Sequence, residues 1–186
     1  MIQRLINQIK KSDPGTADSS HIDLPRVGEI ARDFSLPAAS RPFDQSSQKI
    51  IALSDLRGNP AVLVFYPADN SSVCSSQLTL YNEALLLIQE HDARLVAIST
   101  DDPSSHRDFA ERMKLDFPLL SDSDPAGAVA NEFGVLNPND GLCERALFVL
   151  DGEGRVHWRA VYPRNTNPGM DGILEALESL SIEKDS

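Results

Sequence analysis

The chain has 186 residues, which fits one domain of ordinary size with short appendages. Hydrophobic residues make up 41% and charged residues 24%, a composition typical of globular proteins and not of disordered or fibrous chains. Because 17 basic residues stand against 28 acidic ones, the formal net charge is −11, which disfavours nucleic acid and anionic membranes as partners.

The first residues are typical of an appendage to the domain. Residues 1–11 carry isoleucine and leucine at helical spacing but lack the continuous apolar stretch and cleavage site of a secretory signal. We expect a short frayed or packed helix, with a membrane-surface or partner-docking helix as the alternative. Residues 12–26 are rich in serine, aspartate, proline and glycine, as linkers are. We therefore predict an N-terminal extension and linker over 1–26 and a folded domain over 27–186.

From Val27 onward, apolar runs alternate with stretches of helical period. Runs at Ile50–Leu53, Ala61–Tyr66 and Arg94–Thr100 predict strands, the second of them buried on both faces. Between the last two runs, apolar residues recur at steps of three and four and predict an amphipathic helix, which completes a βαβ unit. The residues of that stripe are Leu78, Tyr81, Leu85 and Ile88.

Two further helices are predicted from the signals at their first residues. Asp102–Pro103 and Asp124–Pro125 each combine a capping side chain with proline at the first helical position. Gly134 stands where the second of these helices would need a left-handed residue at its C-terminal end.

The C-terminal third predicts a hairpin and a helix. The run RALFVLD at residues 145–151 and the stretch RVHWRAVY at residues 155–162 flank a glycine-rich turn at 152–154, the pattern of an antiparallel pair. A last amphipathic helix follows Pro168. Strands mixed with helices on both faces predict an α/β fold, a three-layer sandwich with a mixed central sheet.

The residues able to do redox or metal chemistry are few. Cys74 and Cys143 are too few for a disulfide scaffold or a four-thiolate zinc site, and they favour a reducing, cytoplasmic compartment. No run of about 18 apolar residues occurs, so we expect no membrane span. The histidines share no metal-ligand spacing and are expected at the surface, so we predict no metal site. They are His21, His91, His106 and His157.

Cys74 lies after a buried strand and its loop, at the opening of the predicted helix. The thiolate is the reactive form of cysteine, and the first turn of a helix presents unpaired N–H groups and positive dipole to an anion. The dipole contributes at most about 2 kcal/mol, so a cation or a charged hydrogen-bond donor must complete the stabilisation. The Ser71 hydroxyl is near enough to reach the sulfur, and Pro67 stiffens the loop. On position alone, a buried structural Cys74 and a purely capping Ser71 stay open.

Pro67, Ser71 and Cys74 also fit the pattern P-x-x-x-[TS]-x-x-C, which resembles the active-site motif of peroxiredoxins. The segments ISTDDPSSHRDFAE, FPLLSD, EFGV and RALFVLDGEGRV resemble, in order and spacing, later segments of peroxiredoxins of the alkyl hydroperoxide reductase and thiol-specific antioxidant group. The likeness runs from about Val27 to Leu180. It implies a thioredoxin-like fold and a thiol-dependent peroxidase that reduces hydrogen peroxide or small organic hydroperoxides without a metal or organic cofactor.

The resemblance assigns Cys74 as the cysteine that attacks the peroxide and Arg145 as the active-site arginine. A guanidinium beside the sulfur would hold the thiolate and, being forked, both oxygens of the peroxide. Without the resemblance, a surface ion pair of Arg145 with Glu144 or Glu111 would be the preferred interpretation.

The same resemblance implies the rest of the cycle. Pro67 would shape the pocket and exclude water, and the Ser71 hydroxyl would help stabilise the charge on the leaving oxygen. The sulfenic acid so formed needs a thiol reductant, either a thioredoxin-like protein or a low-molecular-weight thiol. The family also implies a homodimer or a larger homo-oligomer. A thiol–disulfide oxidoreductase or a peroxide-sensing interaction module on the same fold remains the alternative.

The chain departs from the family at three places. Gln77 stands where many members have a glutamate that positions the arginine, and Thr79 where some have a resolving cysteine. No cysteine follows Arg145, so Cys143 is the only candidate resolving cysteine. Its spacing from Arg145 would put both on one strand face, about 7 Å apart and directed at the site. A one-cysteine mechanism with an external thiol, intramolecular resolution by Cys143 and intermolecular resolution all stay open.

Overall fold

A computed structural model describes residues 24–41 and 49–184 of the chain. The helix expected within residues 1–11, and nearly all of the linker expected over 12–26, lie outside the described residues. The described elements are β1 (Ser35–Ala39), β2 (Lys49–Ala52), the 3-10 helix η1 (Leu53–Leu56), β3 (Ala61–Phe65), α2 (Ser72–Glu83), α3 (Leu85–Gln89), β4 (Arg94–Ser99), α4 (Pro103–Met113), β5 (Leu119–Ser121), α5 (Ala128–Glu132), β6 (Arg145–Leu150), β7 (Val156–Tyr162) and α6 (Asp171–Lys184).

Within the described residues, seven strands form one sheet in the order β2-β1-β5-β4-β3-β6-β7. The β3–β4 and β4–β5 pairs are parallel, and the remaining pairs are antiparallel. The predicted mixed sheet, its βαβ unit and its C-terminal hairpin are therefore confirmed. All five residues of β3 are buried, because this strand lies inside the sheet with helices on both sides.

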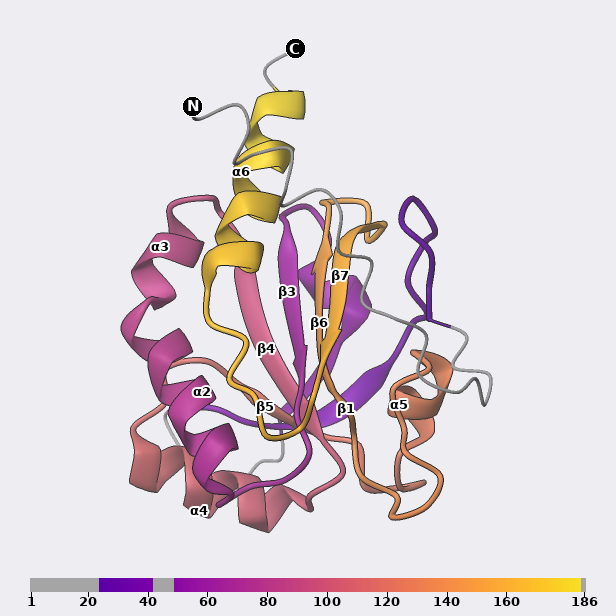
Figure 1. Ribbon diagram of the computed structural model, residues 1–186, viewed down its shortest axis with the longest axis vertical. Coiled ribbons are helices and arrows are strands. Elements are labelled where there is room, and N and C mark those ends of the chain that lie inside the picture. The colour runs from indigo at the N-terminus through magenta and orange to yellow at the C-terminus, as the bar shows by residue number, and fades with distance from the viewer. Residues whose placement is uncertain (1–23, 42–48, 185–186) are drawn as a thin grey trace, which may run out of the picture.

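The side chains of the sheet divide into two hydrophobic clusters, one on each face. Alternate residues of β3 and β6 enter the two clusters, as strand geometry requires. Helices α2, α3, α4 and α6 cover the first face, and η1 and α5 cover the second. Figure 1 shows α5 on the opposite side of the strands from α2 and α3. The fold is the predicted three-layer α/β sandwich.

The capping signals give one correct and one wrong prediction. The Asp102 carboxylate accepts the N–H groups of Ser104 and Ser105, so α4 begins where the Asp-Pro pair predicts. The prediction that Asp124–Pro125 starts the next helix is wrong, because α5 begins at Ala128 after Gly127. The N–H groups of Val129 and Ala130, in its first turn, donate instead to the carboxylate of Asp122, the residue after β5.

Two other details of the helices refine the predictions. The stripe that predicted one helix over residues 78–88 belongs to two, because α2 ends at Glu83 and α3 begins at Leu85. Gly134 has a φ of +66°, as predicted for the residue after α5. Among the described residues, we find no helix with the length and hydrophobicity that crossing a bilayer requires.

Candidate active site

Cys74 is the third residue of α2, in the first turn of the helix. Ser71 is the N-cap residue, and its hydroxyl oxygen accepts the N–H of Cys74 at 3.2 Å. The side chain of Cys74 is fully buried in the cluster on the α2 face of the sheet. The sulfur therefore lies beside the positive end of a helix of 12 residues and away from bulk water.

The loop between β3 and α2 determines where that helix begins. Pro67 is buried, as is Tyr66, which joins it to the end of β3. Asn70 has a φ of +63°, and this left-handed residue turns the chain into Ser71. Ser71 is thus shown as a helix cap, and Pro67 as a buried element of the loop.

Arg145 is the first residue of β6, and only 1% of its surface is exposed. Its Nη2 donates to the sulfur of Cys74 at 3.4 Å. A surface ion pair with Glu144 or Glu111 is therefore excluded as the role of Arg145. Glu144 instead accepts a hydrogen bond from Arg164 at 3.2 Å.

Two groups besides the sulfur fix the guanidinium of Arg145. The backbone carbonyl of Arg164 accepts from Nη2 at 2.7 Å and from Nε at 3.2 Å. The side-chain oxygen of Gln77 accepts from Nη1, and the amide nitrogen of Gln77 donates to Tyr81 at 3.1 Å. Gln77 therefore holds Arg145 as a glutamate would, but without a negative charge.

The charge balance around Arg145 follows from these contacts. Within the part of the chain that the structure describes, no carboxylate bonds to the guanidinium of Arg145. The hydroxyl of Tyr81 adds no charge, because burial raises the pKa of Tyr81 to about 12 despite the lowering effects of Gln77 and Arg145. A buried cation is stable only when it is paired. Of the described groups that bond to the guanidinium, the sulfur of Cys74 is the one able to carry a negative charge.

Comparison with known proteins decides the family. The profile of the AhpC/TSA family matches residues 27–159. Alkyl hydroperoxide reductase E of Mycobacterium tuberculosis is 35% identical over 133 residues, which cover 71% of this chain and 82% of that protein. The chain belongs to the AhpC/TSA family of peroxiredoxins. Its activity is that of a thiol-dependent peroxidase, an oxidoreductase.

Solved structures agree with this assignment. The structure of peroxidoxin BcpB from M. tuberculosis superimposes with a TM-score of 0.71 at 30% identity, covering 84% of this chain and 98% of that chain. AhpC of Enterococcus faecalis superimposes with a TM-score of 0.77 at 24% identity, covering 87% and 96%, and supports the fold alone. The thioredoxin-like fold of this peroxiredoxin is thereby confirmed.

Cys143 does not lie where the sequence placed it. It is fully buried in the hydrophobic cluster on the second face, whereas Cys74 belongs to the cluster on the first. The prediction that Cys143 shares a face with Arg145 is wrong, because β6 begins only at Arg145. Cys143 precedes the strand in an isolated bridge with Leu136, so strand alternation does not extend to it.

The surroundings of Cys143 oppose its ionisation. Burial first, and then the carboxylates of Asp122 and Asp101, raise the pKa of the Cys143 thiol far above its ordinary value. A thiol of this kind is a poor nucleophile at neutral pH.

His106 lies in the interior of this peroxiredoxin. The prediction of a surface residue is wrong, because His106 is fully buried and its Nδ1 lies 3.0 Å from a carboxylate oxygen of Asp69. The helical spacing carried a signal for this: His106 continues the inner stripe of α4 at Phe109, Ala110 and Met113. Asp69 lies in the same loop as the motif residues and was not singled out.

Proposed function

We propose that Cys74 reduces hydrogen peroxide or small organic hydroperoxides by nucleophilic attack of its thiolate on one peroxide oxygen. The S–O bond forms as the O–O bond breaks, the sulfur is oxidised to sulfenic acid, and the other oxygen leaves and takes up a proton as water or an alcohol. The observation that carries the proposal is the 3.4 Å separation of Arg145 Nη2 and Cys74 Sγ.

The neighbouring groups are suited to the charge that develops. As the thiolate loses its charge, negative charge grows on the leaving oxygen. The guanidinium of Arg145 is already in place to stabilise that charge by hydrogen bonding. We assign the Ser71 hydroxyl to hold the first turn of α2 and Pro67 to keep water from the sulfur. Their support is the cap bond at 3.2 Å and the burial of Pro67.

We propose a one-cysteine cycle completed by an external thiol. An external thiol condenses with the sulfenic acid to a mixed disulfide and water, and a second thiol releases Cys74 and an external disulfide. The position of Cys143 in the second cluster and the raised pKa of its thiol favour this route over resolution by Cys143. The donor would be a thioredoxin-like protein or a low-molecular-weight thiol in a reducing, cytoplasmic compartment.

We further propose a homodimer or larger homo-oligomer. β7 is an edge strand of the sheet, and Val161 on it is 44% exposed, which favours pairing at that edge. Sedimentation analysis of the full chain tests this directly, since a monomer at all concentrations would overturn it.

The mechanism is tested by mass spectrometry of the reduced protein after one equivalent of peroxide. The expected product carries one added oxygen on the Cys74 peptide and no link between the two cysteine peptides. Loss of two hydrogens with a Cys74–Cys143 link would overturn the one-cysteine cycle. Fast oxidation that no thiol in a panel can reverse would favour the peroxide-sensing alternative.

A thiol–disulfide oxidoreductase is the less favoured candidate. Such an enzyme needs a second thiol close to the first, and position 77, three residues after Cys74, is glutamine. An insulin-reduction assay separates the two functions, and we expect no activity above that of the reductant alone.

A further inference from the structure

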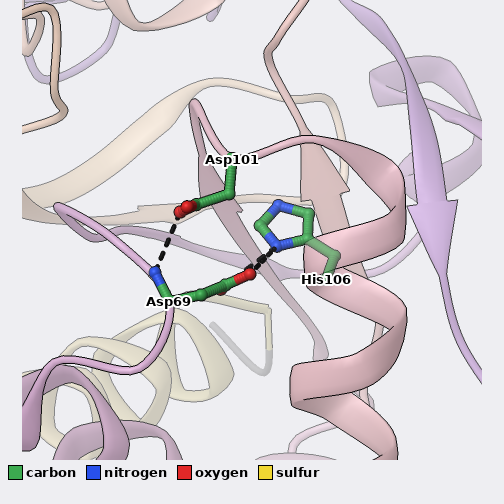
Figure 2. A group of neighbouring side chains, drawn as sticks. All are labelled: Asp69, Asp101 and His106. Carbon is green, nitrogen blue, oxygen red and sulfur yellow. Dashed lines mark hydrogen bonds and ion pairs between the residues drawn. The ribbon is translucent and has the colours of Figure 1, made fainter.

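A buried polar cluster lies beneath the loop that leads into α2. Its centre is the carboxylate of Asp69, which accepts hydrogen bonds from the hydroxyl of Tyr66 at 2.7 Å and of Ser105 at 2.7 Å. Asp69 also contacts His106 of α4, and its backbone N–H donates to the Asp101 carboxylate at 2.9 Å. Figure 2 shows Asp69 between Asp101 on one side and His106 on the other.

The ring nitrogens of His106 both lie at hydrogen-bond distance from neighbouring oxygens. Its Nδ1 lies 3.0 and 3.2 Å from the two carboxylate oxygens of Asp69, and its Nε2 lies 3.1 Å from the carbonyl oxygen of Leu120. The hydroxyl of Tyr66 also lies 3.3 Å from Nδ1. The contact between Nδ1 and Asp69 has the geometry of an ion pair and is fully enclosed. Burial raises the pKa of Asp69, but the hydrogen bond and charge of His106, together with the hydrogen bonds from Ser105 and Tyr66, leave the pKa below its ordinary value. Asp69 and His106 therefore form a buried ion pair.

This ion pair joins the active-site loop to α4. Asp69 is two residues before Ser71, the N-cap of α2, and five before Cys74. Arg112 of α4 makes a second link by donating to the side-chain oxygen of Asn70. The last residues before α2 are thus held against α4 and do not depend on α2 itself.

The sulfur and the guanidinium lie on different elements. Cys74 is carried by α2, whereas Arg145 begins β6 and is held there by the carbonyl of Arg164. Gln77 binds Arg145 from a position three residues farther along α2, and the loop before Ser71 fixes the start of that helix. A displacement of about 1 Å between reacting groups can lower a rate about a hundredfold. The contact of 3.4 Å between the two groups therefore depends on where the loop places the first turn of α2.

We propose that Asp69 and His106 are positioning residues of the peroxidase, whose buried ion pair anchors the start of α2 so that Cys74 stays in register with Arg145. The proposal rests on the roles of Cys74 and Arg145 given above. The ligand atoms of Asp69, Asp101 and His106 lie within 4.8 Å of one another, a spacing that a cation could use. Both Asp69 oxygens and both His106 nitrogens already have hydrogen-bond partners. We therefore interpret the cluster as a structural link between the loop and α4, and not as a cation site.

The test compares two reactions of the same sulfur. Oxidation by hydrogen peroxide, followed by stopped flow, requires a thiolate in register with Arg145, whereas alkylation by iodoacetamide requires a thiolate and access alone. In Asp69→Asn, His106→Asn and the double variant, we expect the ratio of oxidation to alkylation rate to fall about 10- to 100-fold. The double variant should be no worse than the worse single variant, because each substitution breaks the same pair.

His157→Gln is the matched control, since His157 bonds Ser179 at 2.6 Å on the β7–α6 side of the molecule. It should leave the ratio within twofold of the unsubstituted chain. Circular dichroism verifies folding of each variant. Ser105→Ala removes one donor to Asp69 without leaving a charge unpaired, so it keeps the test decisive if Asp69→Asn does not fold. We expect Ser105→Ala to lower the ratio about three- to fivefold.

The outcomes separate this proposal from the proposed function. Folded variants that keep an unchanged ratio, together with fast oxidation of the unsubstituted Cys74, would overturn the positioning role and leave the peroxidase mechanism intact. Slow oxidation of the unsubstituted Cys74, no faster than that of free cysteine, would instead overturn the mechanism itself.

Discussion

The two cysteines have the same exposure and opposite electrostatic surroundings. Cys74 and Cys143 are both fully buried, yet Cys74 lies at a helix N-terminus beside Arg145, whereas Cys143 lies near Asp101 and Asp122. Burial alone raises the pKa of any thiol. We therefore expect the charge that shares the buried site, and not access to solvent, to separate the reactive cysteine from the inert one.

The strongest test of this comparison removes each thiol in turn. We expect Cys74→Ser to abolish peroxide consumption, because no second thiolate can replace it. Cys143→Ser should retain the full rate of Cys74 oxidation and turnover with an external thiol. The measurement is peroxide consumption at neutral pH with excess thiol, and equal losses in the two variants would contradict the division of roles.

The next largest effect is expected when the guanidinium of Arg145 is removed. Arg145→Met leaves the helix dipole and the Ser71 cap in place but removes the guanidinium, and we expect the oxidation rate of Cys74 to fall about 10²- to 10³-fold. Arg155→Met is the control, since Arg155 is half-exposed and pairs with Glu153 in the hairpin turn. A loss below tenfold in a folded Arg145→Met would show that backbone N–H groups alone activate the sulfur.

Most of the fold was predictable because its elements carry strong local signals. β3 is a continuous apolar run, α4 has an Asp-Pro start, and the β6–β7 hairpin has a glycine-rich turn between two apolar runs. The active-site motif was likewise local, since Pro67, Ser71 and Cys74 lie within eight residues.

The errors came from contacts that the local sequence pattern does not reveal. The face on which Cys143 lies depends on the residue at which β6 begins, and the bridge to Leu136 that decides it is not visible in the sequence. The start of α5 depends on Asp122, whose carboxylate accepts the N–H groups of Val129 at 3.1 Å and Ala130 at 2.8 Å. The buried position of His106 was not predicted, because a polar side chain is usually exposed unless it has a buried partner. That partner, Asp69, is distant in the sequence.

Gln77 offers a finer test of the charge at Cys74. Gln77→Glu keeps the hydrogen bond to Arg145 but gives the guanidinium a second anion, which competes with the thiolate for its charge. We expect the rate of Cys74 oxidation at neutral pH to fall about tenfold and the pH–rate profile to move to higher pH. Gln89→Glu adds the same charge at an exposed position of α3 and should change neither. An unchanged profile in Gln77→Glu would mean that Arg145 is not the thiolate's main partner.

The smallest expected effect concerns Cys143 and the stability of the fold at alkaline pH. Because burial raises the pKa of Cys143 in the folded protein, the thiol ionises first in the unfolded chain, near its ordinary pKa of 9.0. Its contribution to stability is therefore complete below that pH and decreases as the pH rises above it. At pH 9.5 the loss reaches about 0.8 kcal/mol, and well above the ordinary pKa it grows by about 1.36 kcal/mol per pH unit.

Urea unfolding under reducing conditions at several pH values between about 7 and 9.5 measures this loss. The upper limit avoids the tyrosines, which ionise in the unfolded chain near pH 10 and whose pKa values are also raised by burial, as for Tyr66 and Tyr162. Cys143→Ala should be less stable than the unsubstituted chain at pH 7, because it removes a buried side chain, but should lose less stability as the pH rises. Parallel curves for the two proteins would show that Cys143 ionises equally well in the folded state, and the contrast between the two cysteines would then not be electrostatic.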